Sequence, residues 1–195
     1  MRPTRTTPPL LALALLGACR MPIDLSGFTS ASLTAPSDAP LELEFEGERL
    51  ATARVPVVPA SLPPALLAAA DRERPGERTM QAFREWDAHG QAWRLVRQRD
   101  GEDLARELLL TEDGAILEEV HPVPTDRIPP EVVAAATARG LLRVQHAAIV
   151  RSELRPHHWR FACEDGAGRP HRVQSDLTGG DVRIARIAHA RSTAW

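Results

Sequence analysis

The residues with the richest chemistry in this sequence are its histidines and a cysteine near the C-terminus. Seven histidines occur in 195 residues. The densest group is His157, His158, Cys163, Glu164 and His171. A zinc site needs three or four nitrogen, sulfur or oxygen ligands at tetrahedral reach. Successive side chains on a strand point to opposite faces, so His157 and Cys163 both oppose His158. At most His158 and His171 could meet across neighbouring strands, and a metal site formed by this pair is kept as an alternative.

Acidic pairs and sequence motifs give no indication of catalysis. Glu118 with Glu119, or Asp100 with Glu102, could act as a general acid and base. These residues fall in turns or on expected solvent faces, so we interpret them as surface charges. The sequence has no lysine, nucleophile elbow, Walker loop, H-E-x-x-H or C-x-x-C motif. We therefore predict that the protein is not an enzyme and needs no cofactor.

The best candidate for function is a set of polar side chains on one face of the expected strands. Trp93 alternates with Arg94, and Trp159 and Cys163 alternate with Arg160, so the tryptophan face is expected to be core and Cys163 an inert thiol. Arginine presents five donors in a plane that suits carboxylate or aromatic recognition. The candidate ligand-binding residues on the opposite face are Arg94, His158, Arg160, Arg172, Gln174 and Arg183.

The N-terminus has the layout of a secretion signal. Arg2 and Arg5 precede an apolar run that ends in Leu16-Gly17-Ala18-Cys19. The run is too short to span a membrane, and its last four residues resemble the bacterial lipobox, in which the cysteine is lipidated. We expect residues 1–18 to be a lipoprotein signal peptide, Cys19 to carry lipid and residues 19–40 to be a flexible tether. Arg20 after the cysteine favours the outer membrane, with the protein facing the periplasm.

The rest of the chain matches itself at a shift of 66 residues. Trp93-Arg94 falls on Trp159-Arg160, and Pro63-Pro64 falls on Pro129-Pro130. In each half a short apolar helix with proline in its first turn precedes segments that alternate as strands do. The pattern predicts an α+β fold of two tandem repeats, each a short helix packed on an antiparallel meander. The expected units are 41–124 (a leading hairpin plus repeat 1), 125–190 (repeat 2) and a tail over 191–195.

These elements resemble a known family. The segments VPASLPPALLAAA and AWRLVRQRDGEDLARELLLTEDGAILEEV are similar to the PepSY-like, beta-lactamase-inhibitor-like domain of bacterial envelope proteins. The resemblance implies helices on one face of an antiparallel sheet, and members that are typically not enzymes. No segment matches an inhibitory loop, so no inhibitor residue is transferred.

Taken together, the sequence predicts a lipid-anchored envelope protein with a binding or scaffolding module. Its partner would be another envelope protein or a peptide, docked on an open sheet face. A formal net charge of −2 argues against nucleic acid as the partner. The alternatives are an inhibitor or modulator of an envelope protease or beta-lactamase, and metal binding through His158 and His171. The sequence indicates no role for the terminal Trp195.

Overall fold

Two short helices form where a pair of prolines precedes an apolar stripe. The computed structural model describes residues 40–191 except 88 and 154. Helix α2 spans Pro64–Glu73 and helix α3 spans Pro130–Thr137, each with proline at its start. Each follows a 3-10 turn, η2 (Pro59–Ser61) or η3 (Thr125–Arg127). Both helices lie where the sequence predicts them.

The strands also fall on the segments that alternate in the sequence. The strands are β1 (Pro40–Glu46), β2 (Arg49–Val57), β3 (Glu77–Asp87), β4 (Gly90–Arg99), β5 (Arg106–Leu110), β6 (Ile116–Val123), β7 (Leu141–Ser152), β8 (His158–Asp165), β9 (Pro170–Asp176) and β10 (Arg183–Arg191).

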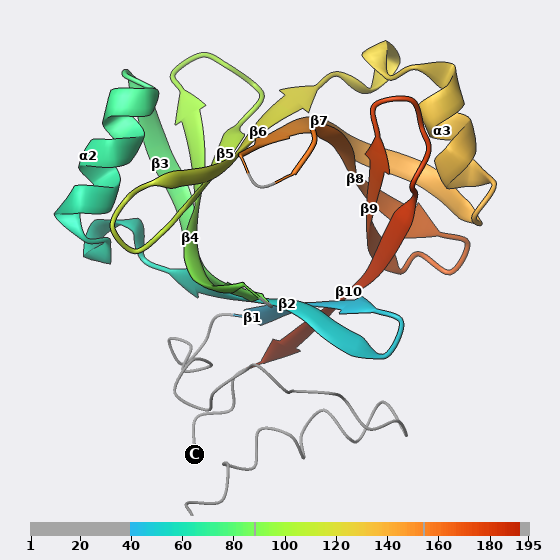
Figure 1. Ribbon diagram of the computed structural model, residues 1–195, viewed down its shortest axis with the longest axis horizontal. Coiled ribbons are helices and arrows are strands. Elements are labelled where there is room, and N and C mark those ends of the chain that lie inside the picture. Colours follow the sequence, from blue (N-terminus) through green and yellow to red (C-terminus); the bar gives the residue numbers. More distant parts are fainter. Residues whose placement is uncertain (1–39, 88, 154, 192–195) are drawn as a thin grey trace, which may run out of the picture.

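The ten described strands form one antiparallel sheet that closes into a barrel (Figure 1). Each strand pairs with its neighbours in sequence, and the first strand completes the circle by pairing with the last. In that closing ladder Leu43 lies opposite Ala188 and Phe45 lies opposite Arg186. The predicted α+β fold of two separate helix-on-meander repeats is therefore wrong. The leading hairpin joins both halves of the chain into a single closed sheet.

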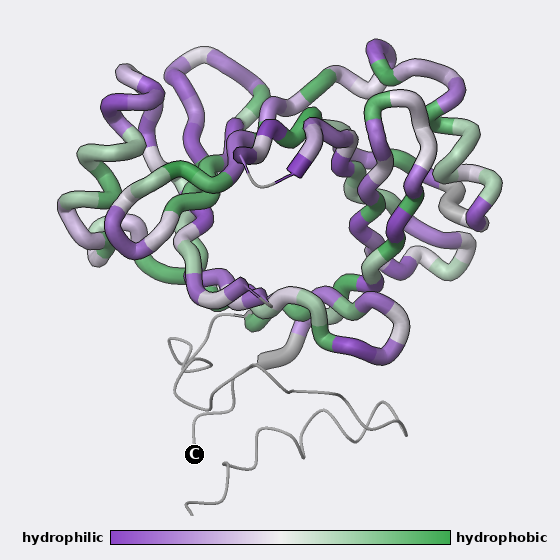
Figure 2. Tube along the Cα trace, in the orientation of Figure 1, coloured by the Kyte–Doolittle hydropathy of each residue, from purple (hydrophilic) through white to green (hydrophobic). Residues whose placement is uncertain are grey.

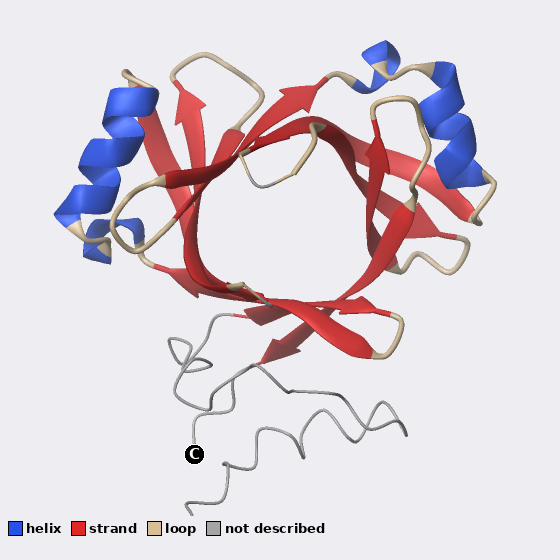
Figure 3. Ribbon diagram, viewed as in Figure 1, coloured by secondary structure: helices blue, strands red, loops and turns tan. Residues whose placement is uncertain are grey.

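Both helices pack against the outside of this barrel (Figure 3). Leu66 of α2 and Val132 of α3 are buried against the outer faces of the strands that follow each helix. Three apolar clusters lie on the outer face. Cluster 1 is Leu62, Leu66, Ala69, Ala70, Ala82, Trp93, Leu95, Leu108 and Leu110. Cluster 2 is Ile128, Val132, Ala136, Ala147, Trp159, Phe161, Cys163 and Val173. Cluster 3 is Leu41, Leu43, Phe45, Leu50, Ala53, Val55 and Trp86.

The opposite face of the same strands lines the barrel interior. Directly paired residues share a face, and successive residues alternate. Trp93 and Trp159 belong to the outer clusters, as the sequence predicts for core residues. Arg94 and Arg160 are next to them in the chain and therefore point inward. Along the strands beside α3, Figure 2 shows hydrophilic and hydrophobic residues in alternation.

Candidate functional site: the barrel interior and its mouth

The interior of the barrel holds a dense set of charged side chains. Cross-strand pairs such as Arg54 with Glu85 and Glu42 with Arg54 lie on the inner face, which matches their register. Their ion pairs connect eight of the ten strands. The acidic members are Glu42, Glu44, Glu85, Glu107 and Glu118, and the basic members are Arg54, Arg94, Arg155, Arg160 and Arg172.

Glu85 is shared by two arginines. Arg54 Nε lies 2.5 Å from Glu85 Oε2. Arg94 donates to both carboxylate oxygens, from Nε at 2.6 Å and from Nη2 at 2.9 Å. Burial disfavours the charged form of Glu85, but the two guanidinium groups outweigh it and hold its pKa well below the usual range. Glu85 is therefore an anion at the centre of one side of the interior.

Glu118 on β6 is also shared by arginines. It accepts hydrogen bonds from Arg160 Nη2 at 2.8 Å and from Arg155 Nη2 at 2.9 Å. Arg94 Nη2 lies 3.6 Å from it and links it to the Glu85 group. Burial opposes ionisation, yet the charges of Arg160 and Arg94 lower the pKa of Glu118 to about 2. The carboxyl group is thus ionised at any physiological pH.

A third group joins the first hairpin to β9. Arg54 also bonds to Glu42 and Glu44 on β1. Arg172 on β9 pairs with the same two carboxylates, 3.4 Å from Glu42 in one case. Burial acts against the charge on Glu42, but Arg54 and Arg172 lower its pKa overall. Glu42 and Glu44 come from the leading hairpin, so closure of the barrel brings them beside Arg172. In separate repeats these charged side chains would lack one another as partners.

Five acidic and five basic side chains thus form a network of equal positive and negative charge. A buried charge is stable when an opposite charge and hydrogen bonds compensate for its lost hydration. Arg94 is 3% exposed, yet all three of its guanidinium nitrogens face carboxylates. The network therefore acts mainly as structure: its ion pairs tie the strands together across the inner face of the barrel.

The predicted ligand-binding residues do share a face, but that face is not open. His158, Arg94 and Arg160 are 8%, 3% and 9% exposed and lie inside the barrel. They are thus out of reach of a docking protein, so the prediction of an open sheet face is wrong. The physical reason is sheet closure, which turns an expected solvent face into an interior. Of the six candidates, Arg172, Gln174 and Arg183 lie at one end of the barrel, where its mouth opens.

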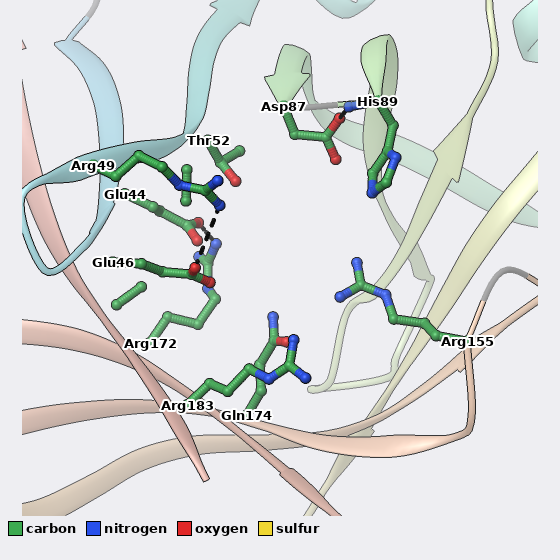
Figure 4. A pocket seen from close by; sticks show the side chains of 12 residues that line it. Glu44, Glu46, Arg49, Thr52, Asp87, His89, Arg155, Arg172, Gln174 and Arg183 are labelled. Atoms are coloured by element: carbon green, nitrogen blue, oxygen red, sulfur yellow. Dashed lines mark hydrogen bonds and ion pairs between the residues drawn. The ribbon is translucent and has the colours of Figure 1, made fainter. Parts of the chain in front are cut away.

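That mouth is a polar pocket of about 190 Å³ (Figure 4). The turns between β1 and β2, β3 and β4, and β7 and β8 meet there around the ends of β9 and β10. Figure 4 shows Arg155 and Arg183 extending toward the same space from different segments. Its lining residues are Glu44, Glu46, Arg49, Ala51, Thr52, Asp87, His89, Arg155, Arg172, Gln174, Arg183 and Ala185.

The histidines and the cysteine do not form a metal centre. His158 points inward, whereas His171 pairs with Cys163 in the ladder and lies on the outer face. His171 Nε2 is 3.2 Å from Asp165, and His158 Nδ1 is 3.1 Å from the carbonyl of Pro156. No group of three or more histidine, cysteine or acidic residues suited to a metal occurs among the described residues. The two candidate ligands are thus held apart by the wall of the barrel.

Cys163 has the environment expected of an inert thiol. It is 1% exposed within cluster 2, and burial raises its pKa to about 11. The thiolate is the reactive form of cysteine. Cys163 is therefore a packing residue at neutral pH.

Sequence reasoning missed the acidic half of the interior. Glu118 was interpreted as a surface charge, but it is 3% exposed and lies inside the barrel, while Glu119 lies on the outer face. A usable signal was present in β1, where Glu42 and Glu44 alternate with Leu41, Leu43 and Phe45. Such alternation fixes which residues share a face. It does not say whether that face meets water or other charged residues.

No helix in the described part of the chain is long and apolar enough to cross a membrane. The predicted signal peptide, Cys19 and the tether over 19–40 lie outside the described residues, as does Trp195; the tether's last residue, Pro40, begins β1.

Comparisons with known proteins find similarity in fold alone. No protein-family model matches the chain, and no curated protein matches it. One solved structure, a DUF2874 family protein from Bacteroides uniformis, is 14% identical with a TM-score of 0.46 and covers 68% of this chain and 93% of its own. A BLIP-like protein from Bacteroides fragilis is 18% identical with a TM-score of 0.42 and covers 69% and 90%. The second neighbour shares a family name with the resemblance seen in the sequence, and neither is described as a PepSY protein. At these identities and scores, the likeness assigns no family and no function to this chain.

Proposed function

We propose that this chain is a non-enzymatic binding module of the cell envelope that recognises a carboxylate group at the mouth of its barrel. The observation that carries the proposal is the convergence of Arg155, Arg172 and Arg183, with Gln174, on one pocket. With Arg49, the pocket has four arginines against three carboxylates. A carboxylate that enters the pocket therefore meets guanidinium donors from several segments of the chain.

Two of these arginines are free enough to turn toward a ligand. The Arg183 side chain is 61% exposed, and its pair with Asp181 at 3.1 Å is also exposed. The Arg155 side chain is 43% exposed and uses Nη2 for Glu118. The Arg183–Asp181 pair is exposed on both sides and contributes little stability, so exchanging it for a ligand carboxylate costs little. Arg172 is held by its ion pairs with Glu42 and Glu44 and would form a rigid part of the pocket lining.

The size of the pocket limits what can enter it. A volume of about 190 Å³ accepts a side chain or a chain end but not a folded surface. The partner would therefore insert a C-terminal carboxylate or an acidic side chain from a peptide or another envelope protein. Inhibition of an envelope hydrolase would be one case of this function, with the hydrolase supplying the acidic group.

Binding can be tested with two tripeptides, acetyl-Ala-Ala-Ala with a free C-terminus and the same peptide with a C-terminal amide. We expect the free acid to bind and the amide to bind at least about tenfold more weakly, because a charged hydrogen-bonded pair contributes about 1.5–3 kcal/mol. Chemical-shift changes at the backbone amides of Gln174 and Arg183, followed during titration, would give both affinities.

Variants at the pocket provide the matched comparison. Arg155→Gln combined with Arg183→Gln should abolish the preference for the free acid. Arg143→Gln, which removes a 75% exposed arginine that does not line the pocket, should leave the preference unchanged. Equal binding of acid and amide by the unmodified protein would rule out carboxylate recognition at the mouth.

We also propose that Cys19 carries the lipid that anchors the module in the outer membrane, facing the periplasm. The support is the Leu16-Gly17-Ala18-Cys19 segment after a short apolar run. Cells grown with labelled palmitate should incorporate the label into the unmodified protein and not into a Cys19→Ser variant. Equal labelling of the two proteins would contradict the anchor.

A further inference from the structure

A second pocket lies on the outer face of the barrel, near the start of β9. It has a volume of about 420 Å³ and lies where the turn between α3 and β7 meets the turn between β8 and β9. None of its lining residues lines the mouth of the barrel, so the two pockets are separate. The lining includes Arg139, Gly140, Asp165, Arg169, His171 and Ile184.

The first half of the chain closes the equivalent corner with an ion pair. At the shift of 66 residues that aligns the two helices, Gly140 corresponds to Arg74. Arg74 donates a hydrogen bond to Glu119 on β6, and the two side chains are 24% and 22% exposed. The pair thus connects the end of α2 to the sheet.

The second half has neither member of this pair. Val173 on β9 takes the place of Leu108 on β5, because each lies opposite the residue two positions after the paired tryptophan. Ile184 on β10 lies opposite Val173, as Glu119 on β6 lies opposite Leu108. Isoleucine therefore replaces the carboxylate, and a glycine without a side chain replaces the arginine. A corner that an ion pair closes in the first half is open in the second.

Two arginines give this open corner its chemistry. Arg139 is exposed, and its Nη1 donates to the carbonyl oxygen of Val182 at 3.1 Å. Among the residues that the structure describes, it makes no ion pair with a carboxylate. Arg169 uses Nε for Asp165 at 2.7 Å, so its terminal nitrogens can serve a ligand. Both guanidinium groups therefore keep donors for an anion.

The carboxylate in the lining is already compensated within its own turn. Asp165 Oδ1 accepts hydrogen bonds from the backbone amides of Arg169 and Ala167 at 3.0 and 2.9 Å. Its Oδ2 lies 3.2 Å from His171 Nε2. These bonds, that of the Arg169 amide above all, hold the pKa of Asp165 well below its usual range. Because its oxygens are already hydrogen bonded, the pocket suits an anion better than a metal ion.

We propose that this pocket binds a small organic anion with a planar apolar body, such as an aromatic carboxylate. Arg139 and Arg169 pair with the acid group, and guanidinium planes also stack on aromatic rings. Ile184, which packs against cluster 2, contacts the apolar body. The volume lies within the range of about 300–1,000 Å³ typical of pockets for small ligands. The inference does not depend on the proposed carboxylate site at the mouth.

Titration of the full chain with benzoate, and with neutral benzamide as the matched probe, tests the site. We expect benzoate to shift the backbone amide signals of Gly166, Ala167 and Ile184, and benzamide to bind at least about tenfold more weakly. Equal binding of the two probes would overturn the proposal. Shifts confined to Gln174 and Arg183 would assign the anion to the mouth and would also overturn it.

A double variant tests the two arginines. Arg139→Gln combined with Arg169→Gln should remove the preference for benzoate over benzamide. Arg127→Gln combined with Arg151→Gln removes the same charge from exposed positions outside the pocket and should leave the preference unchanged. If the first variant kept the preference of the unmodified protein, these arginines would not bind the acid group.

A second variant tests the open corner itself. Ile184→Glu places a carboxylate where the first half has Glu119, beside the two arginines of the pocket. It should weaken benzoate binding at least about tenfold, read from the Gly166 signal, because like charges repel and the new carboxylate competes for the donors. Ile184→Val keeps the apolar surface and should bind benzoate like the unmodified protein. Unchanged affinity in Ile184→Glu would show that the ligand lies elsewhere.

Discussion

Glu118→Gln should destabilise the protein by about 3–5 kcal/mol at pH 7, although it alters one atom of the side chain. The change removes the negative charge that compensates Arg155 and Arg160 at 2.9 and 2.8 Å and leaves these cations beside a neutral amide. Denaturant unfolding followed by circular dichroism would measure the loss. The adjacent Glu119→Gln is the control. Its side chain is 22% exposed and lies on the outer face, so its loss should be about 1 kcal/mol or less.

The dependence of this effect on pH identifies its origin. Glu118 has a pKa of about 2 in the folded protein and about 4.5 when unfolded. Its charge therefore contributes stability that is complete above about pH 4.5 and is lost as the pH falls toward 2. The difference in stability between the unmodified protein and Glu118→Gln should shrink across this range. A constant difference, or one as small as that of Glu119→Gln at pH 7, would mean that water compensates the interior charges.

Trp159→Ala should also cost about 3–5 kcal/mol, because it leaves a cavity between α3 and the barrel wall. Trp159 is 5% exposed, and its ring stacks on Phe161 at 5.7 Å. Thermal unfolding would measure the loss, with Leu104→Ala as a control at a side chain that is 43% exposed. If the alanine variant does not fold, Trp159→Phe should fold with a smaller loss. A loss below about 1 kcal/mol in Trp159→Ala would show that α3 does not pack on this ring.

The sequence was sufficient to predict the two helices and which residues share a face of each strand. The prolines before Leu66 and Val132 predicted both helices, and alternation correctly placed Trp93 and Trp159 in the core. These features depend on neighbours in the chain, so composition and periodicity reveal them.

Barrel closure was not predictable in the same way. It depends on pairing between β1 and β10, which lie at opposite ends of the described chain. A polar face that meets water and one that meets opposite charges have the same alternating pattern. Arg94 and Arg160 were therefore grouped correctly but placed on the wrong kind of surface. Their acidic partners, Glu85 and Glu118, were missed for the same reason.

Closure also has a consequence for how the chain reaches its folded state. The ladder between Leu41 and Ala190 cannot form until nearly the whole chain is present, so the contacts that complete the barrel are among the most distant in sequence. Such pairings form slowly, since a long loop must close before any contact compensates for the lost entropy. Until then β1 and β9 are open edges, and open edges pair readily with other chains. A nascent chain that stops before β10 would therefore expose two unpaired sheet edges, and would be a natural substrate for a chaperone or a protease.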